Sequence, residues 1–140
     1  MAAFVNRLTG TFYGQNGNAF GATAVLGTTD NNALDLRVNG ARAMRLQPTG
    51  GSPNVIGGHA NNAAVPSYEG QTIAGGGTAG ANCFDPPTGT TTRSCANLTN
   101  SLYATVSGGY ANQANSFWSA VGGGTGNTAG GNLSVVGGGA

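Results

Sequence analysis

The chain has 140 residues, of which 27 are glycine, and its formal net charge at neutral pH is +1. A hydrophobic fraction of 39% excludes the usual composition of a disordered chain, and glycine does not recur at every third position as collagen requires. The near-neutral charge lacks the basic footprint of a nucleic-acid-binding protein, and no stretch approaches the roughly 20 apolar residues of a membrane-spanning helix. We therefore expect no nucleic-acid partner and no membrane insertion in this segment.

Residues 1–53 differ in pattern from the rest of the chain and are expected to form an N-terminal cap. The stretch TAVLGTTDN, residues 23–31, predicts a short strand and a turn. In the following stretch, residues 33–46, apolar and charged residues alternate, and Asn39-Gly40 is the favoured dipeptide of a type I′ turn. A β-hairpin is therefore predicted there, with cross-strand or interchain ion pairs among its charged residues, which are Asp35, Arg37, Arg42 and Arg45.

Residues 54–140 contain five similar phrases, each with a valine or isoleucine, one variable residue and paired glycines. The intervals between the aligned apolar residues are 18, 33, 15 and 14, so the basic period is 14 to 15, with insertions in the first two intervals. We predict that these residues are the core rungs of the repeat: Val55, Ile73, Val106, Val121 and Val135.

This period is too short for a repeat built from two helices, but it suits one coil of a parallel β-solenoid. A short strand would direct its valine inward, and the glycines would turn the chain with a positive φ. Asparagines near the turns tolerate the left-handed region and bond locally. Stacked coils would then bury a core that no coil buries alone. The alternative, a flexible glycine-rich linker, does not require periodic valine and isoleucine.

An insertion is predicted at residues 82–103, because the interval between Ile73 and Val106 is about twice the basic period. Cys83 and Cys95 bracket a loop rich in proline, threonine and glycine, and we expect a disulfide there, with two free buried thiols as the alternative. The loop is a candidate ligand-contact surface, although a tolerated decoration explains it equally well. Its candidate contact residues are Phe84, Thr90, Thr91, Thr92 and Arg93.

The sequence contains no nucleophile elbow, phosphate-binding loop or paired-carboxylate signature, so we expect no enzyme activity, no catalytic residue and no cofactor. His59 is the only histidine and no Cys-x-x-Cys pair occurs, so no metal site is expected. Two asparagines, Asn97 and Asn132, match the glycosylation acceptor pattern, as is common in asparagine-rich chains.

The repeats in ATVSGGYANQANSFWSAVGGGTGNTAGGNLSVVGGGA resemble the head repeats of trimeric autotransporter adhesins, the YadA-like heads, over about residues 54–140. That resemblance implies a homotrimer of left-handed parallel β-rolls that is extracellular and serves adhesion to a host-surface protein or glycan. The pattern departs from the family, because Gly-Gly-Gly follows valine where the familiar repeat reads closer to Ser-Val-Ala-Ile-Gly. The stretch GTTDNNALDLRVNGARAMRLQPTGGSPNVIGGHANN is similar to phage-type and bacterial tail-fibre-like proteins, which implies a fibrous trimer.

The sequence therefore predicts an all-β protein, a trimeric parallel β-solenoid with an N-terminal β-hairpin cap. The expected function is a structural and adhesive segment of an extracellular trimeric fibre at a cell surface. Two alternatives remain open: a receptor-binding segment of a phage tail fibre on a virion, and a subunit of a self-assembling extracellular filament.

Overall fold

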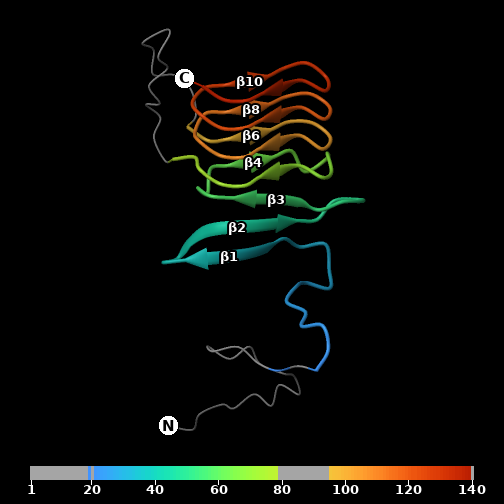
Figure 1. Cartoon of the computed structure of the whole chain (residues 1–140). Helices are drawn as coiled ribbons and strands as arrows, with labels where there is room; N and C mark the ends of the chain where they lie inside the picture. Colours follow the sequence, from blue (N-terminus) through green and yellow to red (C-terminus); the bar gives the residue numbers. More distant parts are fainter. Residues whose placement is uncertain (1–18, 20, 79–94, 140) are drawn as a thin grey trace.

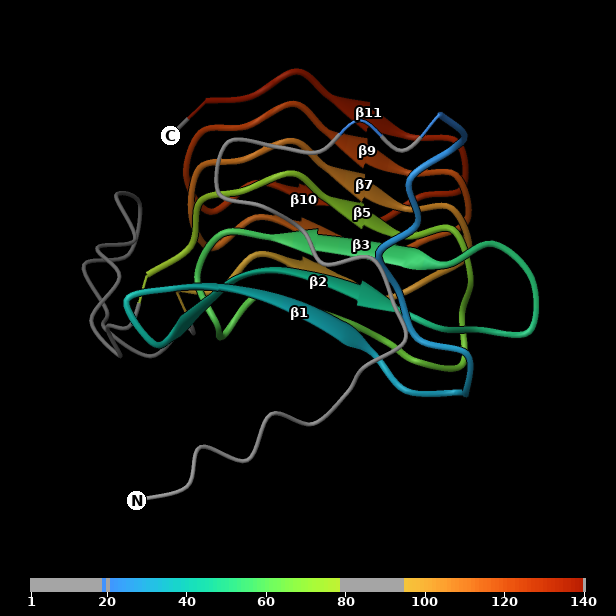
Figure 2. The same cartoon turned by 90° about the horizontal axis from the view of Figure 1, so that it is seen from below.

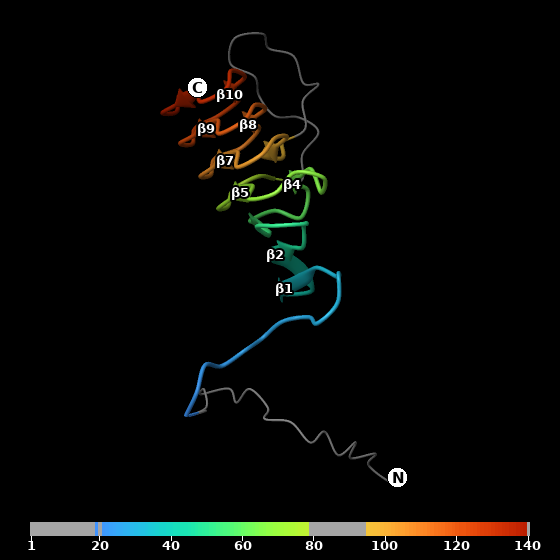
Figure 3. The same ribbon diagram turned by 90° about the vertical axis from the view of Figure 1, so that its right-hand side faces the viewer.

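The chain folds as a β-solenoid of about four turns that stands on a β-hairpin (Figure 1). This computed structural model describes residue 19, residues 21–78 and residues 95–139, which contain no helix. Two sheets run along the stack, one of seven strands in the order β1-β2-β3-β5-β7-β9-β11 and one of four in the order β10-β8-β6-β4. Viewed from the side, the coils are narrow and lie one above another (Figure 3).

The hairpin forms where the alternating pattern predicted it. Strands β1 (Leu34–Val38) and β2 (Ala41–Gln47) pair antiparallel, and Asn39 and Gly40 between them both have a positive φ, as a type I′ turn requires. Strand β2 then pairs antiparallel with β3 (Asn54–Gly57), which opens the first coil. The strand predicted within residues 23–31 does not form, because this segment has no partner for a ladder among the described residues.

Each further coil contributes two-residue strands that pair in parallel with the coils above and below. The larger sheet continues through β5 (Thr72–Ile73), β7 (Thr105–Val106), β9 (Ala120–Val121) and β11 (Val135–Val136), which lie side by side in Figure 2. The smaller sheet contains β4 (Ala63–Ala64), β6 (Leu98–Thr99), β8 (Gln113–Ala114) and β10 (Thr128–Ala129). Val106 pairs with Val121 and Val121 with Val136, so the upper coils are of equal length and confirm the longer value of the predicted period.

The core is a thin double row of side chains between the two sheets. The larger sheet contributes one valine or isoleucine per coil, and the smaller sheet contributes an alanine or a threonine. The buried members of the valine and isoleucine row are Ile56, Ile73, Val106 and Val121, with Val136 partly buried at its end.

Two of the five predicted rungs were wrong by one residue. Val55 is only half-buried and Val135 is 74% exposed, whereas their neighbours Ile56 and Val136 occupy the row. Successive strand residues point to opposite faces, so a one-residue error reverses the predicted side. Both errors fall where two apolar residues are adjacent, at Val55-Ile56 and Val135-Val136, and local sequence does not say which of the two points inward.

The glycines after each rung are required by close packing between coils as well as by backbone conformation. Gly109 has a φ of 74°, and a Cβ atom there would overlap the carbonyl oxygen of Gly124 in the next coil. A Cβ atom on Gly76 would likewise overlap the carbonyl oxygen of Gly109. Any side chain at these corners would therefore push neighbouring coils apart.

A ladder of asparagines runs through the corner that links the larger sheet to the smaller one. The backbone N–H of Asn97 donates to Oδ1 of Asn62, that of Asn112 to Asn97, and that of Asn127 to Asn112, at 2.9–3.1 Å. The Asn112 amide also donates to the carbonyls of Gly108 and Gly124. These asparagines were expected to bond locally, but their main role is to satisfy polar backbone groups between coils.

The insertion begins earlier and ends earlier than residues 82–103. The chain leaves the regular coil near Thr78, whose N–H donates to the carbonyl of Cys95, and it is back in the coil at Cys95. Leu98 and Thr99 form β6 and pair with both neighbouring coils, so the C-terminal part of the predicted insertion belongs to the solenoid. Cys83 lies outside the described residues and Cys95 is buried, so their disulfide stays a prediction.

Candidate functional site

The outer face of the hairpin is apolar, although it faces away from the solenoid core. Residues that pair across β1, β2 and β3 share a face, and Leu46 pairs with both Leu34 and Val55, which lies opposite the rung side. Leu36 pairs with Met44 on this same face, and its side chain is 42% exposed. We call this surface the outer apolar face; its hairpin members are Leu34, Leu36, Val38, Met44 and Leu46.

The charged residues of the hairpin lie on the opposite, inner side. Asp35 pairs with Arg45, which pairs in turn with the rung residue Ile56. The Arg45 guanidinium donates to both Asp35 carboxylate oxygens, at 2.7 and 2.9 Å. This hydrogen bonding lowers the pKa of Asp35 and raises the pKa of Arg45. The predicted cross-strand ion pair is therefore confirmed, and Nη2 of Arg37 lies 3.6 Å from the same carboxylate.

Among the described residues Arg42 has no ion-pair partner, and it closes the bottom of the first coil. Its Nη2 donates to the carbonyls of Ala60 and Asn62, each at 2.8 Å. Desolvation by burial, together with the nearby Arg45 charge, lowers the pKa of Arg42. The inner side of the hairpin thus caps the solenoid with charge, which leaves its leucines on the outside.

Above the hairpin, the outer apolar face continues over small residues. Val55, Thr72, Thr105, Ala120 and Val135 are in register on successive strands. None of these side chains is charged or larger than valine, which permits close approach of another surface. Two of the five are threonines, so the exposed apolar surface lies mainly on the hairpin, and such a patch commonly marks an interaction site.

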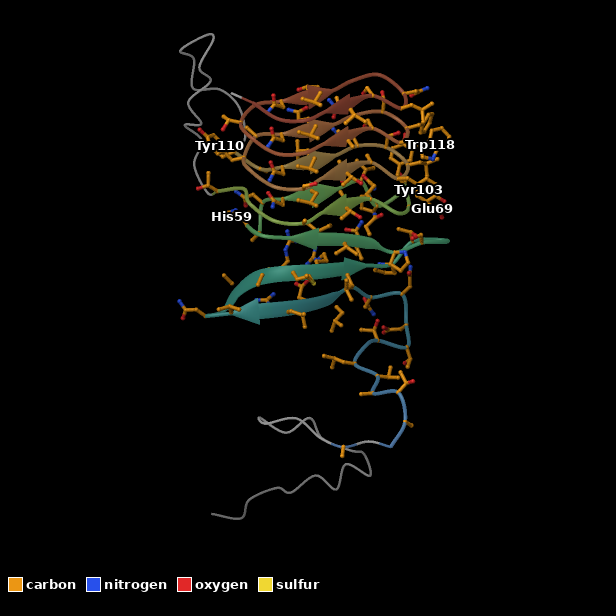
Figure 4. All side chains as sticks on the ribbon, in the orientation of Figure 1. His59, Glu69, Tyr103, Tyr110 and Trp118 are labelled. Atoms are coloured by element: carbon orange, nitrogen blue, oxygen red, sulfur yellow. The ribbon has the colours of Figure 1, made fainter. Side chains whose placement is uncertain are left out.

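A second apolar surface lies on the edge where the smaller sheet returns to the larger one. Figure 4 shows Tyr103 and Trp118 there, in consecutive coils, with Glu69 below them. The Tyr103 hydroxyl donates to the Glu69 carboxylate at 2.6 Å, which raises the pKa of the Tyr103 phenol. The rings of Phe117 and Trp118 are 5.8 Å apart and tilted. We call this surface the aromatic corner; its members are Glu69, Tyr103, Phe117, Trp118 and Leu133.

The aromatic corner carries large side chains on a backbone that favours glycine. Tyr103, Trp118 and Leu133 occupy the same position in three successive coils, with φ values of 54°, 55° and 58°. The left-handed conformation costs a residue with a Cβ roughly 1–2 kcal/mol. In the preceding coil this position is Gly70, which the Tyr103 ring covers. The three side chains are nevertheless 41%, 53% and 71% exposed.

The opposite edge, the asparagine corner, carries His59 and Tyr110 (Figure 4). The His59 Nδ1 accepts a hydrogen bond from the backbone of Asn61, so the imidazole stabilises a turn. Asn97 of the first glycosylation match is fully buried in the asparagine ladder and is inaccessible as an acceptor, whereas Asn132 is exposed. The sequence had no signal that distinguished these two asparagines.

The predicted ligand-contact loop, with Phe84, Thr90, Thr91, Thr92 and Arg93, lies outside the described residues. Within the described ranges, no group of three His, Cys, Asp or Glu side chains gathers to hold a metal ion. The same part of the chain has no helix of sufficient length and apolarity to span a membrane. Tyrosine, tryptophan and leucine share no residue type, so the sequence did not reveal the aromatic corner, although the spacing of Tyr103, Trp118 and Leu133 matches the predicted period.

The chain matches no protein-family model, and no curated protein or solved structure shows significant similarity to it.

Proposed function

We propose that this chain is a structural and adhesive segment of an extracellular trimeric fibre, whose copies associate through the outer apolar face. The observation that carries the proposal is the orientation of the hairpin. Its leucines and methionine point away from the core, while Asp35 and Arg45 pair on the inner side. A chain that functioned alone would be more stable with its apolar side chains inside and its charged side chains outside, because exposed apolar surface is unfavourable in water.

A second copy of the chain is the partner that best suits this face. The surface is uncharged and its hairpin part is apolar, so it can pack against an identical surface, and symmetric association is the usual arrangement of oligomers. The thin core, with only one valine or isoleucine and one small residue per coil, would also gain from burial between copies. The number of three copies comes from the resemblance to adhesin heads.

An extracellular location is part of the proposal. Buried Cys95 stands where the chain re-enters the coil, and a disulfide to Cys83 would close the excursion at its base. Titration of free thiols in the unfolded, unreduced chain tests this bond, and two reactive thiols would refute it. A rigid rod with exposed corners suits presentation of ligand-binding surfaces away from an anchored base.

The test is the molar mass in solution, measured by light scattering over a dilution series. We expect a trimer for the native chain and a monomer for Leu36→Arg, because an arginine on the outer apolar face would bury an unpaired charge between copies. Ala63→Arg is the matched control, since Ala63 is exposed on the smaller sheet. A monomeric native chain, or equal masses for both variants, would refute the proposed interface, and long polymers would favour the end-to-end filament.

A further inference from the structure

We propose that the aromatic corner binds a linear, uncharged polysaccharide, which lies along the stack of coils. This inference rests on the proposed adhesive function and assigns it a ligand class and a surface. It places recognition on the edge opposite His59 and Tyr110, and thus opposite the base of the insertion (Figure 4).

The first argument is that the turn itself does not require large side chains at this corner. The turn needs a positive φ, and glycine supplies it at Gly70 in the preceding coil and in many other turns of this chain. Tyr103, Trp118 and Leu133 accept the unfavourable backbone and still leave much of their side chains in water. Backbone strain of this kind gathers at functional sites, where the side chain has a role that glycine lacks.

The second argument concerns the chemistry of the ligand. Tyr103 and Trp118 offer aromatic rings, and the Glu69 carboxylate beside them accepts the Tyr103 hydroxyl proton and has lone pairs for further donors. A pyranose ring matches this combination, because its C–H face packs on aromatic rings while its hydroxyls donate to a carboxylate. The corner contains no cation, so an anionic ligand such as a nucleic acid or a sulfated glycan has no partner here.

The third argument is geometric. Tyr103, Trp118 and Leu133 repeat once per coil, and paired strands of neighbouring coils are about 4.8 Å apart. This repeat is close to the length of one pyranose unit in an extended chain. Successive sugars of a linear polymer therefore meet successive side chains of the corner, which a small isolated ligand would not exploit.

The experiment uses the intrinsic fluorescence of the full chain, because Trp118 is its single tryptophan. Cellohexaose, hexa-N-acetylchitohexaose and maltohexaose serve as uncharged probes, and a heparin hexasaccharide serves as the charged probe. We expect a saturable blue shift with at least one uncharged probe and none with heparin. Calorimetry then compares variants, and Tyr103→Gly is expected to weaken binding at least tenfold.

Glycine is the informative replacement, since Gly70 shows that the turn accepts it. The matched control is Tyr110→Gly, which removes a tyrosine from the asparagine corner at the position that Gly77 occupies in the preceding coil; it should bind like the native chain. Thermal unfolding of both variants verifies that the fold is retained.

Three outcomes would overturn the inference. In the first, no uncharged probe shifts the fluorescence while Tyr103→Gly keeps its mass and only melts at a lower temperature, so the corner merely stabilises the stack. In the second, Tyr103→Gly changes the molar mass, so the corner is an interface between copies. In the third, Tyr110→Gly weakens binding as much as Tyr103→Gly. A native trimer that binds no probe would refute this inference and leave the proposed fibre role standing.

Discussion

At the scale of single residues, the asparagine ladder explains how a chain with so little apolar bulk holds its coils together. Asn97 and Asn112 each accept a backbone N–H from the next coil and donate to glycine carbonyls. Each buried backbone N–H or C=O group without such a partner would lower the free energy of unfolding by roughly 1–3 kcal/mol. The ladder therefore fixes the register between coils, which the thin aliphatic core alone specifies weakly.

Asn112→Asp tests this role. The carboxylate has the shape of the amide but cannot donate to the carbonyls of Gly108 and Gly124 and would be a buried charge, so we expect a loss of about 3–5 kcal/mol at neutral pH. Burial raises the pKa of the introduced carboxyl, so its folded state binds a proton that the unfolded state releases. The loss should shrink as the pH falls from the raised pKa toward about 4, and it should stay constant below that, where the acid is protonated in both states. Urea unfolding measures it.

The control for this experiment is Asn132→Asp, because Asn132 is exposed. Both variants are compared with the native chain at each pH, which removes the acid sensitivity of other groups. If the two aspartates cost the same, the ladder does not hold the coils in register.

At the scale of elements, the hairpin is attached to the first coil by an antiparallel ladder and by charge on its inner side. Asp35 accepts two hydrogen bonds from Arg45, and Arg42 reaches the corner carbonyls of the first coil. The β1–β2 ladder has a β-bulge after Leu36. Arg37 pairs with Arg42, so Ala43 has no partner on β1. This bulge keeps Arg42 on the inner side, directed at the carbonyls that it caps.

Acid should weaken this attachment. The Arg45 hydrogen bonds hold the pKa of Asp35 below its ordinary value of 3.8, so the unfolded chain takes up a proton first as the pH falls. The stability from this pair is present above about pH 4 and is lost as the pH falls through the lowered pKa. We expect Asp35→Asn to be less stable than the native chain at neutral pH and to lack this acid step. Circular dichroism at several pH values measures both, and Asp30→Asn, in the exposed segment before β1, is the control.

At the scale of the whole molecule, the solenoid is a stack in which each coil contacts its neighbours, so a long excursion from one coil leaves the rest intact. Counted from β5, Gly77 occupies the coil position that Tyr110 occupies in the next coil. Counted back from β6, Cys95 occupies that same position. The chain therefore passes this position twice, and residues 77–94 are additional to one regular coil. Removing them joins Gly76 to Cys95 and restores the regular period seen in the next coils.

We therefore expect the chain without residues 77–94 to fold. Its far-ultraviolet circular dichroism spectrum should have the same shape as that of the native chain, and its thermal transition should be cooperative. Reducing buffer is used for both proteins, so that a disulfide does not enter the comparison. The matched control removes the equally long segment 86–103, which contains β6 and follows the boundary predicted from sequence. The control deletion should unfold the chain. If the deletion of residues 77–94 unfolds it as well, the excursion is part of the fold.

The sequence by itself determined the elements whose pattern is local. The alternation around Asn39-Gly40 predicted the hairpin, and the recurring valines and glycines predicted a parallel solenoid, because side-chain period and turn chemistry need no knowledge of distant residues. The rungs Ile73, Val106 and Val121 were identified for the same reason.

Only the tertiary structure decided what depends on the neighbouring coil. Whether Val55 or Ile56 points inward follows from pairing with Thr72 and Ile73, and the role of Asn112 follows from the stacking of Asn97 beneath it. The hairpin's apolar side faces outward because β2 pairs with β3 in the register that places Arg45 beside Ile56. A one-residue change in that register would reverse the two faces, so long-range pairing, rather than the local pattern, fixes which surface the molecule offers to a partner.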